Sequence, residues 1–379
     1  MRNNEVTQAR KPDGARLEAV PVDDEALAAA QAIIGIEHRR GDAVIEVTPD
    51  IVRDYCVFMG SQNPLFLDLG YARLTRWGGI TAPPTMLGSA IIHPRLPGIQ
   101  PVYVGTEWDF QQAVHVGEII VQRAKYTGAE KRMGGNVPQS VLQTAEVTCT
   151  NQRNEVVTNS KTYIMRVPRS KTPGGLSYKP RYPRYSAKQI AAIDKEIESE
   201  KIRGSKPRFW EDTAIGEQLG PVIYGPYTVT EICFTGLYLD MGRHVGMGTN
   251  PGAHVFRFAN FKRDPKTGLP FAEGGGHWQL SMAEEIGMPG RYDYGPQRLS
   301  WLCRLVTDWM GDDAFLKKLA GRLKRPNIVG DTTLVRGEVE RKWVEDKEHL
   351  VKCRLWAENQ VGEITMTGSG IVRLLARCP

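Results

Sequence analysis

Val-Gly-Glu-Ile-Ile-Val-Gln-Arg at residues 116–123 returns as Val-Gly-Asp-Thr-Thr-Leu-Val-Arg at residues 329–336. Each stretch places an acidic residue after a glycine, which favours a turn, and continues with the apolar alternation of a strand. Gly117 and Gly330 are 213 positions apart, because 330 − 117 = 213. The recurrence indicates that one structural unit occurs twice along the chain.

A second motif supports the repeat. The pattern Asn-Gln-x-x-Glu occurs at residues 151–155 and again at residues 359–363, an offset of 208. In both places we expect a strand to end at the Asn-Gln pair and another to begin after a short turn. The two motifs therefore relate the strands of one half of the chain to those of the other.

The offset is smaller earlier in the repeat. Thr48 and Thr230 each precede a helix-like run as N-cap candidates, and they are 182 positions apart. Ala72 and Ala283 stand in matching local sequences and are 211 positions apart. The second unit has therefore gained 211 − 182 = 29 residues, which we place within the glycine-rich stretch 243–276.

The two units are separated by a segment of different composition. Residues 167–185 are rich in Pro, Gly and basic side chains, as linkers are, and residues 187–203 have the apolar spacing of a surface helix. We expect an N-terminal unit at 1–166, a linker with a connecting helix at 167–206, and a C-terminal unit at 207–379.

Each unit reads as a strand, a helix, a turn rich in Gly or Pro, and then long alternating strands joined by short turns. This order predicts an antiparallel sheet that wraps one helix, and so the α+β class. The long strands expected in the first unit are Pro101–Phe110, Glu118–Tyr126, Ser140–Gln152 and Glu155–Val167. In the second unit we expect the run Leu299–Met310 to be amphipathic, with Trp301, Leu302, Leu305 and Trp309 in the core.

Composition narrows the class of protein. The chain has 379 residues, 41% of them hydrophobic and 24% charged, as in globular proteins that fold around a core. No stretch approaches the roughly 20 apolar residues of a membrane span, and the first residues lack the apolar segment of a signal peptide. We therefore expect a cytoplasmic protein without a membrane partner.

Charge and cysteine spacing exclude further classes. The net charge is +6, and no dense basic block with interleaved aromatic residues occurs, so we expect no nucleic-acid partner. The six cysteines stand apart from one another without CxxC spacing, which favours reduced thiols. Neither the cysteines nor the seven histidines have the spacing of a metal site, so we expect no metal.

The first unit contains Gly-Ser-Gln-Asn-Pro-Leu-Phe-Leu-Asp at residues 60–68, then Ala72, and Gly-Gly-Ile-Thr-Ala-Pro-Pro at residues 78–84. With these motifs, each half resembles a hot-dog module of the MaoC-like dehydratases, also called (R)-specific enoyl-CoA hydratases. In the second unit His277 stands six residues before Ala283, as in that family. The resemblance covers the chain from about residue 30 onward and implies a double hot-dog fold with a FAS1-like dehydratase half at the N-terminus.

The resemblance also implies a catalytic arrangement. Catalysis in the family depends on an Asp and a His five residues apart. In the first unit these positions hold Ser61 and Phe66, so we expect this unit to be non-catalytic and to make room for a bulky acyl group. In the second unit His277 is retained, but Ala272 stands where the Asp is expected.

The resemblance and the residue types together leave several catalytic candidates. We expect His277 to hold and deprotonate a water, with Asp240 or Glu273 as its carboxylate partner. His254 is either a second catalytic histidine or a residue of the inserted loop. Asp68 in the first unit is expected to make structural hydrogen bonds.

Binding residues follow from the same comparison. We expect the central helix to begin beside Ala283, so that the glycines ending at Gly276 supply backbone N–H donors to the thioester oxygen. The other residues expected to bind substrate are Tyr294, Gly295, Arg298, Gly79 and Asn63. Lys324 and Arg325 either pair with CoA phosphates or belong to a solvated strand edge.

The functional prediction is hydration of an α,β-unsaturated acyl-CoA, or the reverse dehydration of a 3-hydroxyacyl-CoA. The CoA thioester is the substrate and no separate cofactor is expected. A catalytically silent subunit of a hydratase complex and a hot-dog thioesterase are the alternatives. The chain mimics a dimer by itself, and a homodimer of such chains is also expected.

Overall fold

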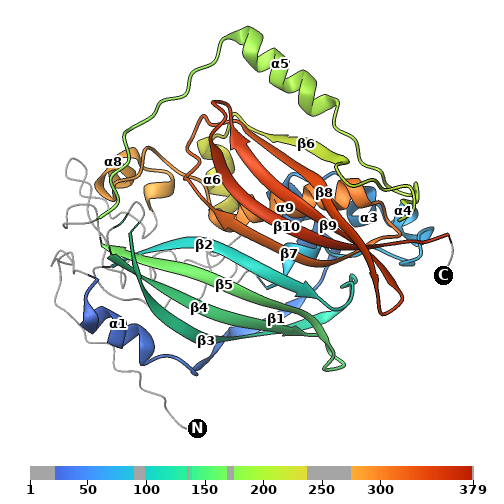
Figure 1. The fold of residues 1–379 in the computed structure, drawn as a ribbon, viewed down its shortest axis with the longest axis horizontal. Helices are drawn as coiled ribbons and strands as arrows, with labels where there is room; N and C mark the ends of the chain where they lie inside the picture. The colour runs from blue at the N-terminus through green and yellow to red at the C-terminus, as the bar shows by residue number, and fades with distance from the viewer. Residues whose placement is uncertain are drawn as a thin grey trace.

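The computed structural model describes residues 22–88, 99–134, 137, 139–168, 175–236 and 275–377. Within them the strands form one antiparallel sheet in the order β1-β3-β4-β5-β2-β7-β10-β9-β8-β6 (Figure 1). The first unit supplies β1 (Glu37–Glu46), β2 (Ile99–Phe110), β3 (Ile119–Met133), β4 (Gln139–Thr150) and β5 (Val156–Pro168). The second supplies β6 (Gln218–Tyr224), β7 (Phe315–Leu323), β8 (Thr333–Glu345), β9 (Glu348–Asn359) and β10 (Ile364–Leu374).

Helices occupy the segments that precede the long strands of each unit. The first unit has α1 (Asp24–Gln31), α2 (Pro49–Met59), α3 (Pro64–Leu67), α4 (Leu69–Arg73) and the 3-10 turn η1 (Pro84–Met86). The linker carries α5 (Ala187–Glu198), and the second unit has α6 (Val229–Gly236), η3 (Gly275–His277), α8 (Leu280–Glu285) and α9 (Gly295–Met310). These elements and the antiparallel sheet confirm the predicted α+β class.

The internal repeat extends to single hydrogen bonds. Gly117 and Gly330 both have positive φ, at 94° and 92°. Asn151 Oδ1 accepts from the backbone N–H of Glu155 at 3.0 Å, and Asn359 Oδ1 accepts from that of Glu363 at 3.0 Å. Both recurring motifs are therefore turn motifs, selected because the glycine tolerates positive φ and the asparagine satisfies the turn backbone.

The first helix of each unit shows one error in the prediction. Thr48 Oγ1 caps α2 by accepting from the N–H of Ile51 at 3.2 Å. In the second unit the cap is Thr228, which accepts from the N–H of Glu231 at 3.2 Å, and not Thr230. The threonines are thus 228 − 48 = 180 positions apart, and the second unit has gained 211 − 180 = 31 residues.

A second correction concerns the central helix. The helix beside Ala283 is α8, which has six residues and is followed by Gly287 with φ 77°. The long buried helix is α9, in which every residue from Pro296 to Met310 is buried. The prediction of a core run at Leu299–Met310 is confirmed, but the long helix begins at Gly295 and not at the glycines that precede His277 in the sequence.

The two units meet along an antiparallel pair of strands, β2 and β7. Trp108 lies opposite Leu319, and 319 − 108 = 211, the same offset that separates Ala72 from Ala283. Equivalent residues face each other at this point, so the strand seam coincides with the approximate two-fold axis between the units. One core cluster spans both units and includes α9 residues.

The linker is tied to the second unit. The N–H of Tyr178 donates to the carbonyl of Gly287 at 2.9 Å, and that of Arg181 donates to Pro289 at 2.8 Å. Ser186 then starts α5 with a capping box, and α5 buries none of its residues. The helix lies at the outside of the molecule (Figure 1). The predicted connecting helix is present but ends at Glu198.

We predict that Gly321→Val destabilises the protein. A Cβ at Gly321, which lies on β7 opposite Thr106, would stand 2.3 Å from Leu299 Cδ2. Overpacking of this kind costs about 1–3 kcal/mol, which urea unfolding would measure. Gly128→Ala is the matched control, because its added Cβ would meet only Thr144 at 3.7 Å. An unchanged unfolding midpoint for Gly321→Val would contradict the packing described here.

Candidate active site

His277 lies at the end of η3, beside the start of α9, and its ring is half-buried. The ring stacks on Tyr294 with centroids 3.8 Å apart and an interplanar angle of 19°. The Tyr292 ring is tilted against it, with the two ring centroids 4.1 Å apart. A Cβ at the buried residue Gly276 would lie 3.1 Å from the Tyr292 ring, which is closer than ordinary contact. A glycine at position 276 therefore allows the chain to place His277 against Tyr292 and Tyr294.

The protonation state of His277 follows from its contacts. Nδ1 lies 2.8 Å from the carbonyl oxygen of Tyr292. Because a carbonyl can only accept, Nδ1 carries the proton and the lone pair of the neutral ring is on Nε2. Burial lowers the pKa of His277 to about 4, against a smaller opposing effect of the carbonyls of Tyr292 and Asp293. The ring is neutral near pH 7 and can act as a base.

The N-terminus of α9 supplies a second element. Tyr294 is the N-cap residue and its side chain makes no capping hydrogen bond. Pro296 has no N–H and the N–H of Gln297 donates to the carbonyl of Tyr294 at 3.1 Å, so the donor that the helix start presents is the N–H of Gly295. A Cβ at Gly295 would lie 2.5 Å from Tyr103 Cδ1, on the first unit. Residues of both units therefore close around the helix start, next to the His277 ring.

A buried ion pair fixes the first turn of α9. Arg298 Nε and Asp293 Oδ2 are 2.7 Å apart, and both side chains are almost fully buried. Arg298 Nη1 also donates to the carbonyl of Arg325 at 2.7 Å. Burial raises the pKa of Asp293 to about 7, the charge of Asp331 adds to the rise, and Arg298 opposes it. Arg298 thus holds the turn on which Tyr294 and Gly295 stand.

The structure brings together one group of the predicted site residues. Tyr294 touches His277. Gly276 precedes His277 in η3, and Gly295 and Arg298 belong to the start of α9. Lys324 and Arg325 are exposed just after β7, beside Arg298, and Arg325 lies 3.7 Å from Glu363. The choice between CoA phosphates and a solvated strand edge stays open for this pair.

Other predicted residues are not at this site. Asn63 caps α3, its Oδ1 accepting from the N–H of Leu65 at 3.0 Å. Gly79 is half-buried, and a Cβ added to it would meet no atom within 4 Å. Asn63 lies near residues of the far end of α9, about 20 Å from the helix start at 1.5 Å per residue. Asp68 makes the structural bond expected of it, accepting from the N–H of Tyr71 at 3.0 Å.

Three candidates fall elsewhere in the chain. Asp240, His254 and Glu273 lie outside the described residues, so the identity of the carboxylate partner stays a prediction. The sequence motifs also missed Tyr292 and Asp293, which contact the imidazole and Arg298. The only signal for them was their position directly before the predicted residues Tyr294 and Gly295.

Comparison with known proteins identifies the fold. Residues 32–160 match the family model of the FAS1-like dehydratase domain region, and no curated protein sequence matches the chain. A solved MaoC-like dehydratase is 15% identical, with a TM-score of 0.63 over 91% of this chain and 100% of that chain. A protein described as a MaoC domain dehydratase from Chloroflexus aurantiacus is 16% identical, with a TM-score of 0.57 over 91% and 96%.

A third structure decides the architecture. A conserved hypothetical protein from Mycobacterium tuberculosis, described as a double hot-dog fold, is 12% identical, with a TM-score of 0.53 over 90% of this chain and 96% of that chain. The chain is a double hot-dog protein. The resemblance to MaoC-like dehydratases drawn from the sequence motifs is confirmed, and the match at residues 32–160 falls in the first hot-dog unit.

Two kinds of feature are absent from the described residues of this double hot-dog chain: a cluster of metal ligands and a helix that could span a membrane. No group of three or more His, Cys, Asp or Glu side chains there is arranged to hold a metal ion. Nor does any helix in that part of the chain have the length and apolar character needed to cross a bilayer.

We predict a pH-dependent stability contribution from His277. Its pKa is about 4 in the folded protein, against 6.5 for an unperturbed histidine, so the folded state binds fewer protons between these values. Acidification from pH 7 to pH 5 should therefore destabilise the wild type by up to about 2 kcal/mol relative to His277→Asn. Urea unfolding of both proteins at the two pH values measures this difference, and equal pH dependence would contradict a lowered pKa of His277 in the folded protein.

Proposed function

We propose that this chain catalyses hydration of an α,β-unsaturated acyl-CoA thioester, or the reverse dehydration of a 3-hydroxyacyl-CoA. The observation that carries the proposal is the neutral His277 ring, held by the Tyr292 carbonyl beside the uncapped start of α9. A base and a backbone N–H donor for the thioester oxygen are two of the elements that this reaction requires from the protein.

The roles follow from the proton balance. Nε2 of His277 takes a proton from water, and the resulting hydroxide adds to the β-carbon of the enoyl group. The electron pair of the double bond moves toward the thioester oxygen, where the N–H of Gly295 at the start of α9 stabilises the enolate. A proton then returns to the α-carbon, so that one water is added in all.

The proton donor is proposed to be a carboxylic acid of the second unit. Asp240 and Glu273 remain the two candidates, and His254 is a further candidate for holding the water. Asp293 is a less suitable choice, because its carboxylate is paired with Arg298 in the core. Its role in the proposal is to fix the loop that carries Tyr294.

The first unit is proposed to contribute binding without chemistry. Phe66 stands where the second unit has His277, because 277 − 66 = 211, the offset between the units. A phenyl ring has no lone pair to accept a proton, so this position cannot supply the base. We retain a bulky acyl group as the expected substrate, with Lys324 and Arg325 exposed and available to CoA phosphates.

The setting of the reaction is proposed as well. We expect a cytoplasmic enzyme that needs no cofactor beyond its thioester substrate. Chains of this kind are expected to work singly or as homodimers. Ala272 stands at the position where the family has its catalytic Asp. Its presence favours one alternative, a catalytically silent subunit that supports an active hydratase.

The test is to incubate the protein with a panel of enoyl-CoAs and to monitor hydration by the loss of the enoyl absorbance. His277→Ala should lower kcat/KM by about 10²–10⁴-fold, the usual contribution of a general base. Phe66→Leu, at the equivalent position of the first unit, is the control and should retain activity. Thiol release without hydration would favour the thioesterase, and no turnover of any thioester would favour the silent subunit.

A further inference from the structure

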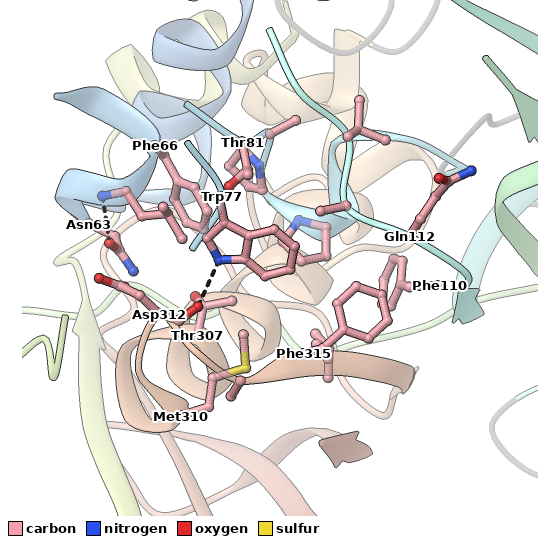
Figure 2. Close-up of a pocket in the computed structure, with 18 of the residues that line it drawn as sticks. Asn63, Phe66, Trp77, Thr81, Phe110, Gln112, Thr307, Met310, Asp312 and Phe315 are labelled. Carbon is pink, nitrogen blue, oxygen red and sulfur yellow. Dashed lines mark hydrogen bonds between the residues drawn. The ribbon is translucent and has the colours of Figure 1, made fainter. Parts of the chain in front are cut away.

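A cavity lies between the two units, at the C-terminal end of α9 (Figure 2). Phe66, Trp77 and Phe110 line it from the first unit, and Met310 and Phe315 from the second. The space between its walls, together with the open solvent at its mouth, is about 640 Å³. Aromatic and aliphatic walls of this kind favour an apolar ligand over water.

The cavity occupies the place that corresponds to the His277 site. The helices α3 and α4 begin at residues 64 and 69, and η3 and α8 begin at residues 275 and 280, so both pairs differ by 211. Phe66 in the cavity wall is thus the counterpart of His277. The chain has two related sites, one at each end of α9, of which this one lacks the catalytic histidine.

A difference in side-chain size explains the open space. At the His277 end, the ring of Tyr103 presses on Gly295. The counterparts at the cavity end, by the same offset of 211, are Ala314 and Pro84, and both line the cavity. The methyl group of Ala314 takes the place of a phenol ring, so room is left between the units.

One end of the cavity is polar. Asp312 accepts a hydrogen bond from the hydroxyl of Tyr71 through Oδ2, and its backbone carbonyl accepts from Trp77 Nε1 at 2.7 Å. Its other oxygen, Oδ1, is buried and has no hydrogen-bond partner among the described residues. A buried acceptor without a partner is costly, and a ligand that donates a hydrogen bond would satisfy it.

The same group disfavours anions. Asp312 is only 3% exposed, and the partner of its carboxylate among the described residues is the neutral hydroxyl of Tyr71, not a cation. A carboxylate placed beside it would meet a like charge in a medium of low dielectric. An alcohol would instead donate to Oδ1 and lay its apolar part along the aromatic walls.

We propose that this cavity is a second, non-catalytic ligand site that binds a neutral molecule with an apolar body and one hydroxyl group. The site is separate from His277 and does not depend on the proposed hydratase activity. Small hydroxylated aliphatic molecules are the class that fits both the walls and the free acceptor.

Isothermal titration of the full chain with 1-octanol tests the proposal. One saturable site is expected, with octanoate binding at least tenfold more weakly at pH 8. Ala314→Tyr, which introduces the counterpart side chain, should weaken octanol binding at least tenfold. Ala113→Phe narrows the cavity from the first unit and should weaken binding in the same way if Ala314→Tyr does not fold.

Three controls distinguish this site from nonspecific binding and from the His277 site. Leu74→Tyr, at a residue 90% exposed, should leave octanol binding unchanged. His277→Asn should also leave it unchanged, so a failed hydratase assay does not bear on this result. Asp312→Asn should narrow the difference between octanol and octanoate. The proposal is overturned by any one of three results. These are octanol binding that does not saturate, normal octanol binding by both Ala314→Tyr and Ala113→Phe, or octanoate binding as tight as octanol binding.

Discussion

The pairing of β2 with β7 is the constraint on which the rest of the structure depends. Because Trp108 faces Leu319 across the seam at the repeat offset, the edge strands of the two units join around a two-fold axis. Backbone hydrogen bonds that would face solvent at an edge are satisfied within the chain. The seam also places each unit's motif loop against the other unit, so neither site is built from one unit alone.

The seam makes α9 a shared element. Its start carries the loop of His277 and Tyr294, and its end carries Met310 in the cavity wall. Arg304 in its middle pairs with Glu200 of the linker and lies 3.3 Å from Asp308. Burial raises the pKa of Asp308 to about 7, and Arg304 opposes the rise. The helix that separates the two sites is thus also the anchor of the linker.

Much of the architecture could be predicted because it is written in local patterns. Turn glycines and asparagines recur at fixed spacing, and the apolar run at 299–310 marks a buried helix. The errors have a common cause. Thr228 and Thr230 are equally good N-cap candidates in the sequence. Only the hydrogen bond from the N–H of Glu231 to Thr228 Oγ1 identifies Thr228 as the cap. Tyr292 acts through its contact with His277, and Asp293 acts through its ion pair with Arg298, and no sequence motif marks either contact.

The double unit lets the two sites diverge through a few contacts. At the position equivalent to His277, the first unit has Phe66, so an apolar side chain in the cavity wall takes the place of a base. Tyr103 and Ala314 occupy equivalent positions and act on the opposite unit. Tyr103 of the first unit packs against the site of the second, and Ala314 of the second unit lines the cavity of the first. Space at one site is therefore governed by a strand of the opposite unit. In a symmetric dimer one substitution changes both sites at once, whereas in a fused chain each site can be altered alone.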